Sequence, residues 1–199
     1  MTTKLDLYKK HKSEYVTPRQ PRLVRVQPAQ YLTIDGQGEP GGERFQACIG
    51  ALYGMAFTIK MTRKFAGRGD YAVCKLEGQY LCDLAATPKK NWKWKLMIRT
   101  PEFIGPPEMK KAVATLLKRG KPPEFKEVKL ETLKEGDCVQ MLHVGPYDKE
   151  RETVAQMLEF VEAEGWKLAG DHHEIYLSDP RRVPPEKLRT IIRLPLSKK

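Results

Sequence analysis

Three polar side chains at alternate positions near the carboxyl end of the chain are the first candidates for chemistry: His172, Glu174 and Tyr176. Successive side chains of a β-strand point to opposite faces, so these three share one face of a predicted strand. A carboxylate is costly to bury there unless something pairs with it. The spacing therefore favours a glutamate that holds a cation or acts as a general base. The alternative is a polar strand face that is open to water.

Aromatic side chains form a second group of candidates. Trp92 and Trp94 alternate on one predicted strand and share a face, which suits either a sheet core or a surface that stacks on a flat ligand. Tyr53 and Phe57 are four residues apart on a predicted helix, so they lie on one side of it. They allow the same two interpretations, as part of the core or as part of a ligand-binding wall.

A turn between a predicted strand and a predicted helix carries a further aromatic residue. In the sequence His-Val-Gly-Pro-Tyr at 143–147, Gly-Pro forms the turn and Tyr147 stands at the start of the helix. There Tyr147 either packs as a hydrophobic staple or directs its hydroxyl into a site. Glu150 and Glu152 follow in the first helical turn, where the helix dipole favours acidic side chains and no other role is required.

Several kinds of site are not expected. The four cysteines are scattered without a CxxC or HxxxH pair, and dinucleotide, Walker, GxSxG and HExxH patterns are absent. We therefore expect no metal site and no cofactor. Cys138 falls in a predicted buried strand, so we expect it to pack in the core rather than to react.

Composition and charge limit the classes of partner. The 199 residues include 36 Lys and Arg against 25 Asp and Glu, which gives a net charge of +11, and 40% are hydrophobic. The basic residues are spread along the chain and form no recognition helix, so nucleic-acid binding is the minority interpretation. The sequence has no run of about 18 apolar residues, so no membrane partner is expected. Its polar amino-terminal segment lacks the pattern of a secretory signal, so a cytoplasmic location is expected.

The order of predicted elements indicates an α+β fold with an internal duplication. Residues 22–100 read strand, helix, strand, strand, and residues 137–195 repeat that order, with a connecting helix and strand at 101–131. We expect residues 21–196 to form a single domain after a polar arm at 1–20. Each β-α-β-β repeat is expected to place its helix on one side of an antiparallel sheet, with a ligand cleft between the two halves.

Several element boundaries are also predicted. Residues 70–75 and 79–83 are expected to be strands, with Gly78 as a bend or bulge between them. A strand is expected at 125–131, because Val128 and Leu130 alternate with polar residues there.

Parts of the sequence resemble the GyrI-like small-molecule-binding family. The matching runs are His-Val-Gly-Pro-Tyr at 143–147, His-His-Glu-Ile-Tyr-Leu-Ser-Asp-Pro-Arg-Arg at 172–182 and Leu-Arg-Thr-Ile-Ile-Arg-Leu-Pro at 188–195. Stand-alone members of about this length are similar in further runs, namely Gly-Gln-Gly-x-Pro at 36–40, Leu-Glu-Gly at 76–78 and Trp-Lys-Trp-Lys-Leu-Met-Ile-Arg at 92–99. The resemblance covers roughly residues 20–196, and the run at 172–182 is its most specific part.

This resemblance implies an aromatic cleft with a central glutamate, matched here by Glu174, that takes planar or cationic molecules. Some stand-alone members are similar to hydrolases that open the cyclopropane of DNA-alkylating natural products. Glu174 and Tyr147 would then be catalytic. Relatives place tryptophans just after the Leu-Glu-Gly turn, where Tyr80 is the residue expected to keep part of that wall. The expected ligand-binding residues are Trp94, Tyr176, His172, Tyr80, Trp92, Tyr53 and Phe57.

Two functions of different classes follow from these residues. The first is a module that sequesters planar, hydrophobic compounds, cationic ones included, through aromatic stacking and charge pairing with Glu174. The second is a hydrolase that adds water to a strained ring in the same cleft. A weaker third interpretation, motivated by the net charge, is a nucleic-acid-associated or gyrase-associated protein. The protein is expected to act as a monomer or homodimer.

Overall fold

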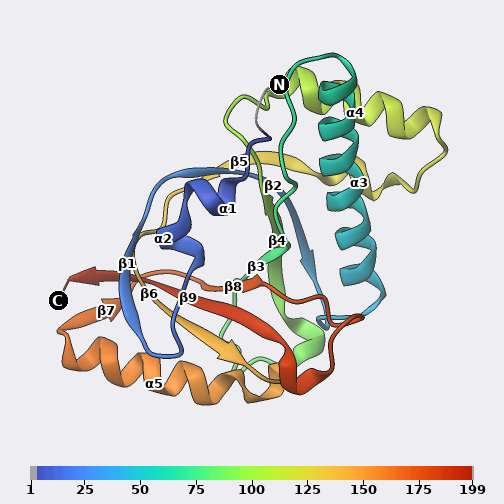
Figure 1. Cartoon of the computed structure of the whole chain (residues 1–199). Helices are drawn as coiled ribbons and strands as arrows, with labels where there is room; N and C mark the ends of the chain where they lie inside the picture. Colours follow the sequence, from blue (N-terminus) through green and yellow to red (C-terminus); the bar gives the residue numbers. More distant parts are fainter. Residues whose placement is uncertain (1–3, 199) are drawn as a thin grey trace. The chain divides into compact units, whose positions relative to one another are not determined.

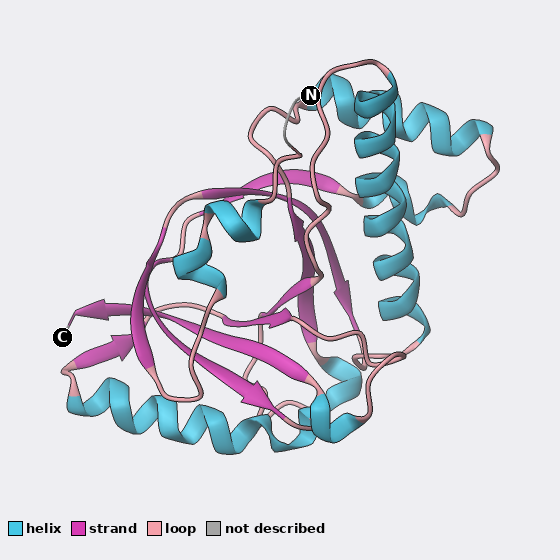
Figure 2. Ribbon diagram, in the orientation of Figure 1, coloured by secondary structure: helices cyan, strands magenta, loops and turns pink. Residues whose placement is uncertain are grey.

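The computed structural model describes residues 4–198 and divides the chain into two compact units. Unit 1 takes residues 29–133 together with the amino-terminal segment up to Lys10, and unit 2 takes His11–Pro28 and the chain from Lys134 onward. Each unit combines antiparallel strands with helices (Figures 1 and 2), which confirms the expected α+β class. Among the described residues, no helix is long and apolar enough to cross a membrane.

Unit 1 has a four-stranded antiparallel sheet in the order β3-β4-β2-β5. Its strands are β2 (Ala29–Gln37), β3 (Glu77–Tyr80), β4 (Lys93–Arg99) and β5 (Lys129–Leu133). Its helices are α1 (Leu7–Lys10), α3 (Glu43–Phe65) and α4 (Pro106–Lys118), with short 3-10 helices at Lys89–Asn91 and Pro123–Glu127.

Unit 2 has an antiparallel sheet in the order β1-β6-β9-β8, and β7 pairs with the end of β9. Its strands are β1 (Arg22–Val26), β6 (Gly136–Val144), β7 (Trp166–Leu168), β8 (His172–Tyr176) and β9 (Arg189–Lys198). Its helices are α2 (Lys12–Tyr15) and α5 (Glu150–Ala163), with 3-10 helices at Tyr147–Lys149 and Pro185–Lys187.

The expected duplication is confirmed by the order and the register of the strands. Unit 1 runs β2-α3-β3-β4, and unit 2 runs β6-α5-β8-β9 after the same pattern. In unit 1, Leu96 of β4 stands between Ile34 and Gly78 of its two neighbours. In unit 2, the equivalent row is Thr190 of β9 between His143 and Tyr176. The same scaffold therefore carries apolar residues in one unit and polar ones in the other.

Trp94 belongs to the core of unit 1. Its ring is 1% exposed, its Nε1–H donates to the carbonyl oxygen of Gly38 at 3.0 Å, and it meets Phe45 edge-on at 5.0 Å. Across the strand pair, Gly36 stands opposite Trp94, and the ring lies against the space where a side chain at Gly36 would project. Helix α3 closes this core with Leu52. The sequence rule of alternation thus placed Trp94 correctly on an inward face.

The core of unit 2 lies between α5 and one face of its sheet. Met157 and Val161 of α5 pack against Val139, Met141 and Ile192. On the opposite face, the guanidinium of Arg193 donates to Glu135 at 2.7 Å and to Gln140 at 2.6 Å, and His173 bonds the other oxygen of Glu135 at 2.8 Å. That buried acid therefore has two basic partners, which hold its pKa far below the usual range although burial alone would raise it.

The amino-terminal segment, expected as a polar arm, is packed in its described part. Tyr15 is buried, and Arg193 and Gln140 both donate to the main-chain oxygen of Glu14. Strand β1, which the sequence grouped with the first repeat, pairs with β6 and so belongs to the sheet of unit 2. These contacts were not foreseen because they join residues far apart in the sequence.

Three boundaries predicted from the sequence are wrong. Residues 70–75 form only a single bridge, between Tyr71 and Leu5, because no neighbouring strand runs beside them. Gly78 is in regular register with Leu96 and is no bulge. Residues 123–127 form a 3-10 helix ahead of β5, because prolines at 122 and 123 favour the start of a helical turn.

The contact between Gly36 and Trp94 predicts a stability difference between two glycine variants. In Gly36→Ala, the added β-carbon would overlap the buried ring, so we expect a loss of about 1–3 kcal/mol. Gly50→Ala, in α3 with open space around it, is expected to gain about 0.5–1 kcal/mol. Urea denaturation of both variants measures the difference, and equal stabilities would contradict this packing.

Candidate functional site

Glu174 lies on the face of the unit 2 sheet that α5 covers. The register places it beside Ile192, which in turn stands beside Met141, and both of these pack in the core under α5. His173, the next residue before it, stands beside Arg193 and belongs to the opposite face. The alternation predicted for this strand is confirmed, and it brings Glu174 close to the first turn of α5.

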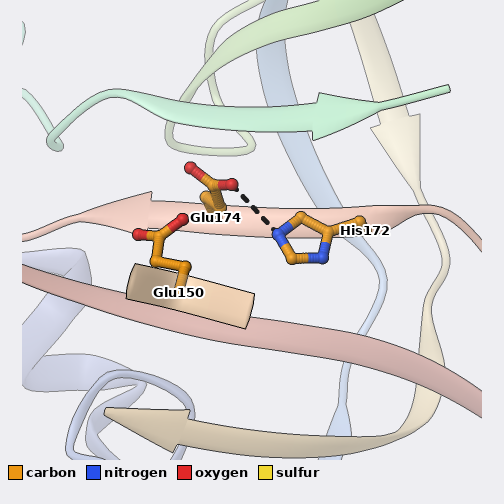
Figure 3. Close-up of side chains that lie close together, drawn as sticks. All are labelled: Glu150, His172 and Glu174. Atoms are coloured by element: carbon orange, nitrogen blue, oxygen red, sulfur yellow. Dashed lines mark hydrogen bonds and ion pairs between the residues drawn. The ribbon is translucent and has the colours of Figure 1, made fainter. Parts of the chain in front are cut away.

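A second carboxylate meets Glu174 there. Three polar side chains converge here, those of Glu150, His172 and Glu174 (Figure 3). One carboxylate oxygen of each glutamate and one ring nitrogen of the histidine lie within 4.8 Å of one another. Nε2–H of His172 donates to Oε1 of Glu174 at 3.0 Å, the contact drawn as a dashed line. Glu150 is only 7% exposed and Glu174 only 5%. Two acids are thus buried together, with one imidazole beside them.

Burial and a neighbouring charge shift the pKa of Glu150. Burial, then the charge of Glu174 and a hydrogen bond with it, raise the pKa of Glu150 to about 10, while the hydroxyl of Thr190 lowers it. Its Oε1 has no hydrogen-bond partner among the described residues. With its pKa raised this far, Glu150 is expected to keep its proton at neutral pH.

Two tyrosines stand beside this acidic pair. Tyr147 and Tyr176 meet edge-on, with ring centroids 6.0 Å apart and an angle of 88° between the rings. Burial, followed by the charges of Glu150, Glu174 and Asp179, raises the pKa of Tyr147 to about 12. Its hydroxyl consequently keeps its proton and can donate a hydrogen bond, although 40% of the residue is exposed. A partly exposed tyrosine next to buried carboxylates is suited to contact a ligand.

His143 fixes the turn that presents Tyr147 and Glu150. Its Nε2 lies 3.2 Å from the carbonyl oxygen of Pro146, and its Nδ1 lies 2.8 Å from the hydroxyl of Thr153 on α5. The carbonyl can only accept, so Nε2–H donates to it, while Nδ1 shares a hydrogen bond with the hydroxyl of Thr153. The imidazole thereby joins the end of β6 to α5.

The aromatic residues predicted in unit 1 fall into two groups. Trp94 and Tyr80 are buried in the core, and Trp92 meets Tyr80 edge-on at 5.4 Å while donating to the carbonyl oxygen of Thr87. Tyr53 and Phe57 instead stack on each other along α3 at 6.1 Å, and Phe57 is 50% exposed. A role in ligand binding stays a prediction for all of them.

Glu150 is the site residue that the sequence interpretation missed. The helix dipole gave a sufficient reason for an acid at that position, so burial was not considered. The signal was nevertheless present: Glu150 precedes Met157 by two helical turns and lies on the same side as Thr153 and Val161. The buried stripe of α5, extended to its first turn, would have placed Glu150 inward.

Comparison with known proteins gives this geometry a family. The GyrI-like small-molecule-binding domain matches residues 19–197. The chain belongs to this GyrI-like family. Among curated proteins, no match was found.

Solved structures support the same assignment for this GyrI-like protein. An uncharacterized conserved protein from Listeria innocua is 39% identical, with a TM-score of 0.90 over 98% of this chain and 100% of that one. A hydrolase from Listeria innocua is 38% identical, with a TM-score of 0.89 over 98% and 100%. The C-terminal domain of EcmrR, 14% identical with a TM-score of 0.60 over 90% and 98%, shares the fold alone.

The buried pair predicts how stability of this GyrI-like protein depends on pH. A carboxyl group whose pKa is raised in the folded state stabilises at low pH and loses that contribution as pH rises toward the folded value. Between pH 5 and pH 9, the wild type is therefore expected to lose up to about 1.4 kcal/mol per pH unit relative to Glu150→Gln. Urea denaturation across this range measures the difference.

Glu152→Gln is the matched control, because Glu152 lies in the same helical turn but is exposed. It is expected to follow the wild type. The groups that face Glu150 are Glu174, His172, Tyr147 and Thr190. Parallel curves for the wild type and Glu150→Gln would show that Glu150 does not carry the proton.

Proposed function

We propose that this GyrI-like protein binds planar, hydrophobic small molecules, cationic ones included, and hydrolyses those that carry an electrophilic cyclopropane. One observation carries the proposal: the buried carboxyl pair of Glu150 and Glu174 lies next to Tyr147, a partly exposed tyrosine. A general base and a hydrogen-bond donor side by side are what addition of water to a polarised ring requires.

Binding would use the aromatic edges and the carboxylates of unit 2. The rings of Tyr147 and Tyr176 offer apolar area that retains a polar tip, which suits a flat chromophore with heteroatoms. A positive charge on the ligand would be attracted both by the carboxyl pair and by the faces of these rings. His172 would contribute by orienting Glu174 through its hydrogen bond.

The chemical step adds one water molecule across a strained carbon–carbon bond. Glu174 accepts a proton from water as the oxygen attacks a ring carbon, and the cyclopropane bond breaks. Its electron pair moves into the conjugated carbonyl of the substrate, whose oxygen gains negative charge. Tyr147 donates a hydrogen bond to that oxygen, and the proton taken by Glu174 then neutralises the product. Ring strain in the substrate lowers the demand on the protein.

The comparisons support the reaction class and leave the substrate open to experiment. A structural neighbour that is 38% identical over nearly the whole chain is described as a hydrolase. In this chain, neighbouring positions on β6, β9 and β8 of unit 2 carry polar side chains, whereas the equivalent positions of unit 1 carry apolar residues. Both observations favour a catalytic protein over one that only sequesters its ligand.

Glu174→Gln tests the catalytic assignment. Incubation with a planar cyclopropane-bearing compound, followed by mass spectrometry, is expected to show gain of one water with repeated turnover by the wild type. Loss of the general base is expected to slow turnover about 10²–10⁴-fold. Glu152→Gln, on the exposed side of α5, is expected to retain full activity.

Two results would contradict this assignment. Fluorescence quenching that shows tight binding, while the compound keeps its mass, would favour the non-catalytic sequestering protein. Unchanged binding and turnover in Glu174→Gln would show that the carboxylate has neither role.

A further inference from the structure

Buried acids in unit 2 differ in how their charge is balanced. On one face of the sheet, Glu135 is paired with Arg193 and His173. On the other face, Glu150 and Glu174 have no lysine or arginine partner among the described residues. The imidazole of His172 is the basic group in contact with Glu174, at 3.0 Å. Two carboxylates that are buried without a lysine or arginine beside them can be neutralised by a bound cation.

The geometry is that of converging ligands. The Nε2 of His172 and Oε1 of Glu174 are already separated by a distance that two neighbouring ligands of one metal ion adopt, since metal–ligand bonds are about 2.0–2.2 Å. The carboxylate of Glu150 lies within 4.8 Å of both. One oxygen of this carboxylate belongs to the group, and its Oε1 is buried with no hydrogen-bond partner among residues 4–198. Small side-chain rotations would bring all three onto one ion.

The ligand types indicate which metals fit. One imidazole nitrogen with two carboxylates suits zinc, manganese, iron and cobalt in their divalent states. Magnesium and calcium prefer oxygen ligands alone and more of them. Three protein ligands also leave positions for water or a substrate oxygen.

We propose that Glu150, His172 and Glu174 bind one divalent transition-metal ion. The sequence rules did not indicate this site, because they look for ligands within one short motif, whereas these come from α5 and β8. The inference does not rest on the proposed hydrolysis. It uses the same carboxylates, so a metal ion and a cationic ligand would exclude each other there.

Metal binding is tested on the full chain with zinc as the probe and no organic compound present. After treatment with a chelator and buffer exchange, calorimetric titration is expected to show one zinc ion per chain, and the thermal midpoint is expected to rise with zinc concentration. Cobalt is the second probe, because its visible absorption changes in intensity and position when protein ligands replace water around the ion. Glu150→Gln and His172→Ala are each expected to weaken zinc binding more than about 100-fold, since loss of even an outer partner costs 10–100-fold.

Two matched controls separate this site from adventitious binding. Glu152→Gln removes an exposed acid from the same helical turn, and Cys82→Ser removes the partly exposed thiol. Both are expected to bind zinc as the wild type does. Zinc affinity that is equal in the wild type and Glu150→Gln, or that depends on Cys82, would overturn the proposal. Glu150→Gln nearly preserves shape, so a folding failure in His172→Ala does not remove the test.

Failure of this inference and failure of the proposed function are distinguishable. Turnover of the cyclopropane-bearing compound is measured with a chelator present, and zinc binding is measured without the compound. A protein that hydrolyses but binds no zinc refutes the metal site alone. A protein that binds zinc but neither binds nor hydrolyses the compound refutes the proposed function alone.

Discussion

Two carboxyl groups buried side by side, with no arginine or lysine beside them in the described part of the chain, set the main constraint on unit 2. Like charges a few ångströms apart repel strongly where water is excluded, so both groups cannot remain ionised without a compensating positive charge. Protonation of Glu150, whose pKa is raised to about 10, would neutralise one of them in the free protein, and an organic cation or a metal ion would do so in the complexes that we propose. In this account, stability and ligand charge both depend on how Glu150 and Glu174 are neutralised.

The rest of the fold shows that this constraint is not required for folding. Unit 1 has the same strand order, and at the equivalent positions its sheet carries Ile34, Leu96 and Gly78 under α3. Unit 2 replaces that row with His143, Thr190 and Tyr176, and adds Glu150 from α5. The apolar unit displays what the scaffold needs for stability. We expect the polar residues of unit 2 to lower stability relative to apolar ones, which is the trade-off that functional residues commonly show.

Periodicity in the sequence predicted the elements whose partners lie within one repeat. The alternation of Trp92, Trp94 and Leu96 and that of His172, Glu174 and Tyr176 both gave the correct faces, and the duplication followed from element order. Features that depend on distant partners were missed, among them the burial of Tyr15 against the sheet of unit 2 and the single bridge at Tyr71. Glu150 was missed for another reason. An acid in the first turn of a helix can interact with the helix dipole or belong to a site, and only its burial in the structure distinguishes these two interpretations. The repeated Ile-Arg-x-Pro at 98–101 and 192–195 is a trace of the duplication that the sequence itself retains.

Infrared difference spectroscopy of the metal-free, ligand-free protein tests most directly whether Glu150 holds a proton. A protonated carboxyl group has a carbonyl band that a carboxylate lacks. We predict this band at neutral pH in the wild type and in Glu152→Gln, and its absence in Glu150→Gln. A wild-type spectrum that shows only ionised carboxylates at neutral pH would contradict the account, because the two acids would then be balanced by some other group or separated in solution.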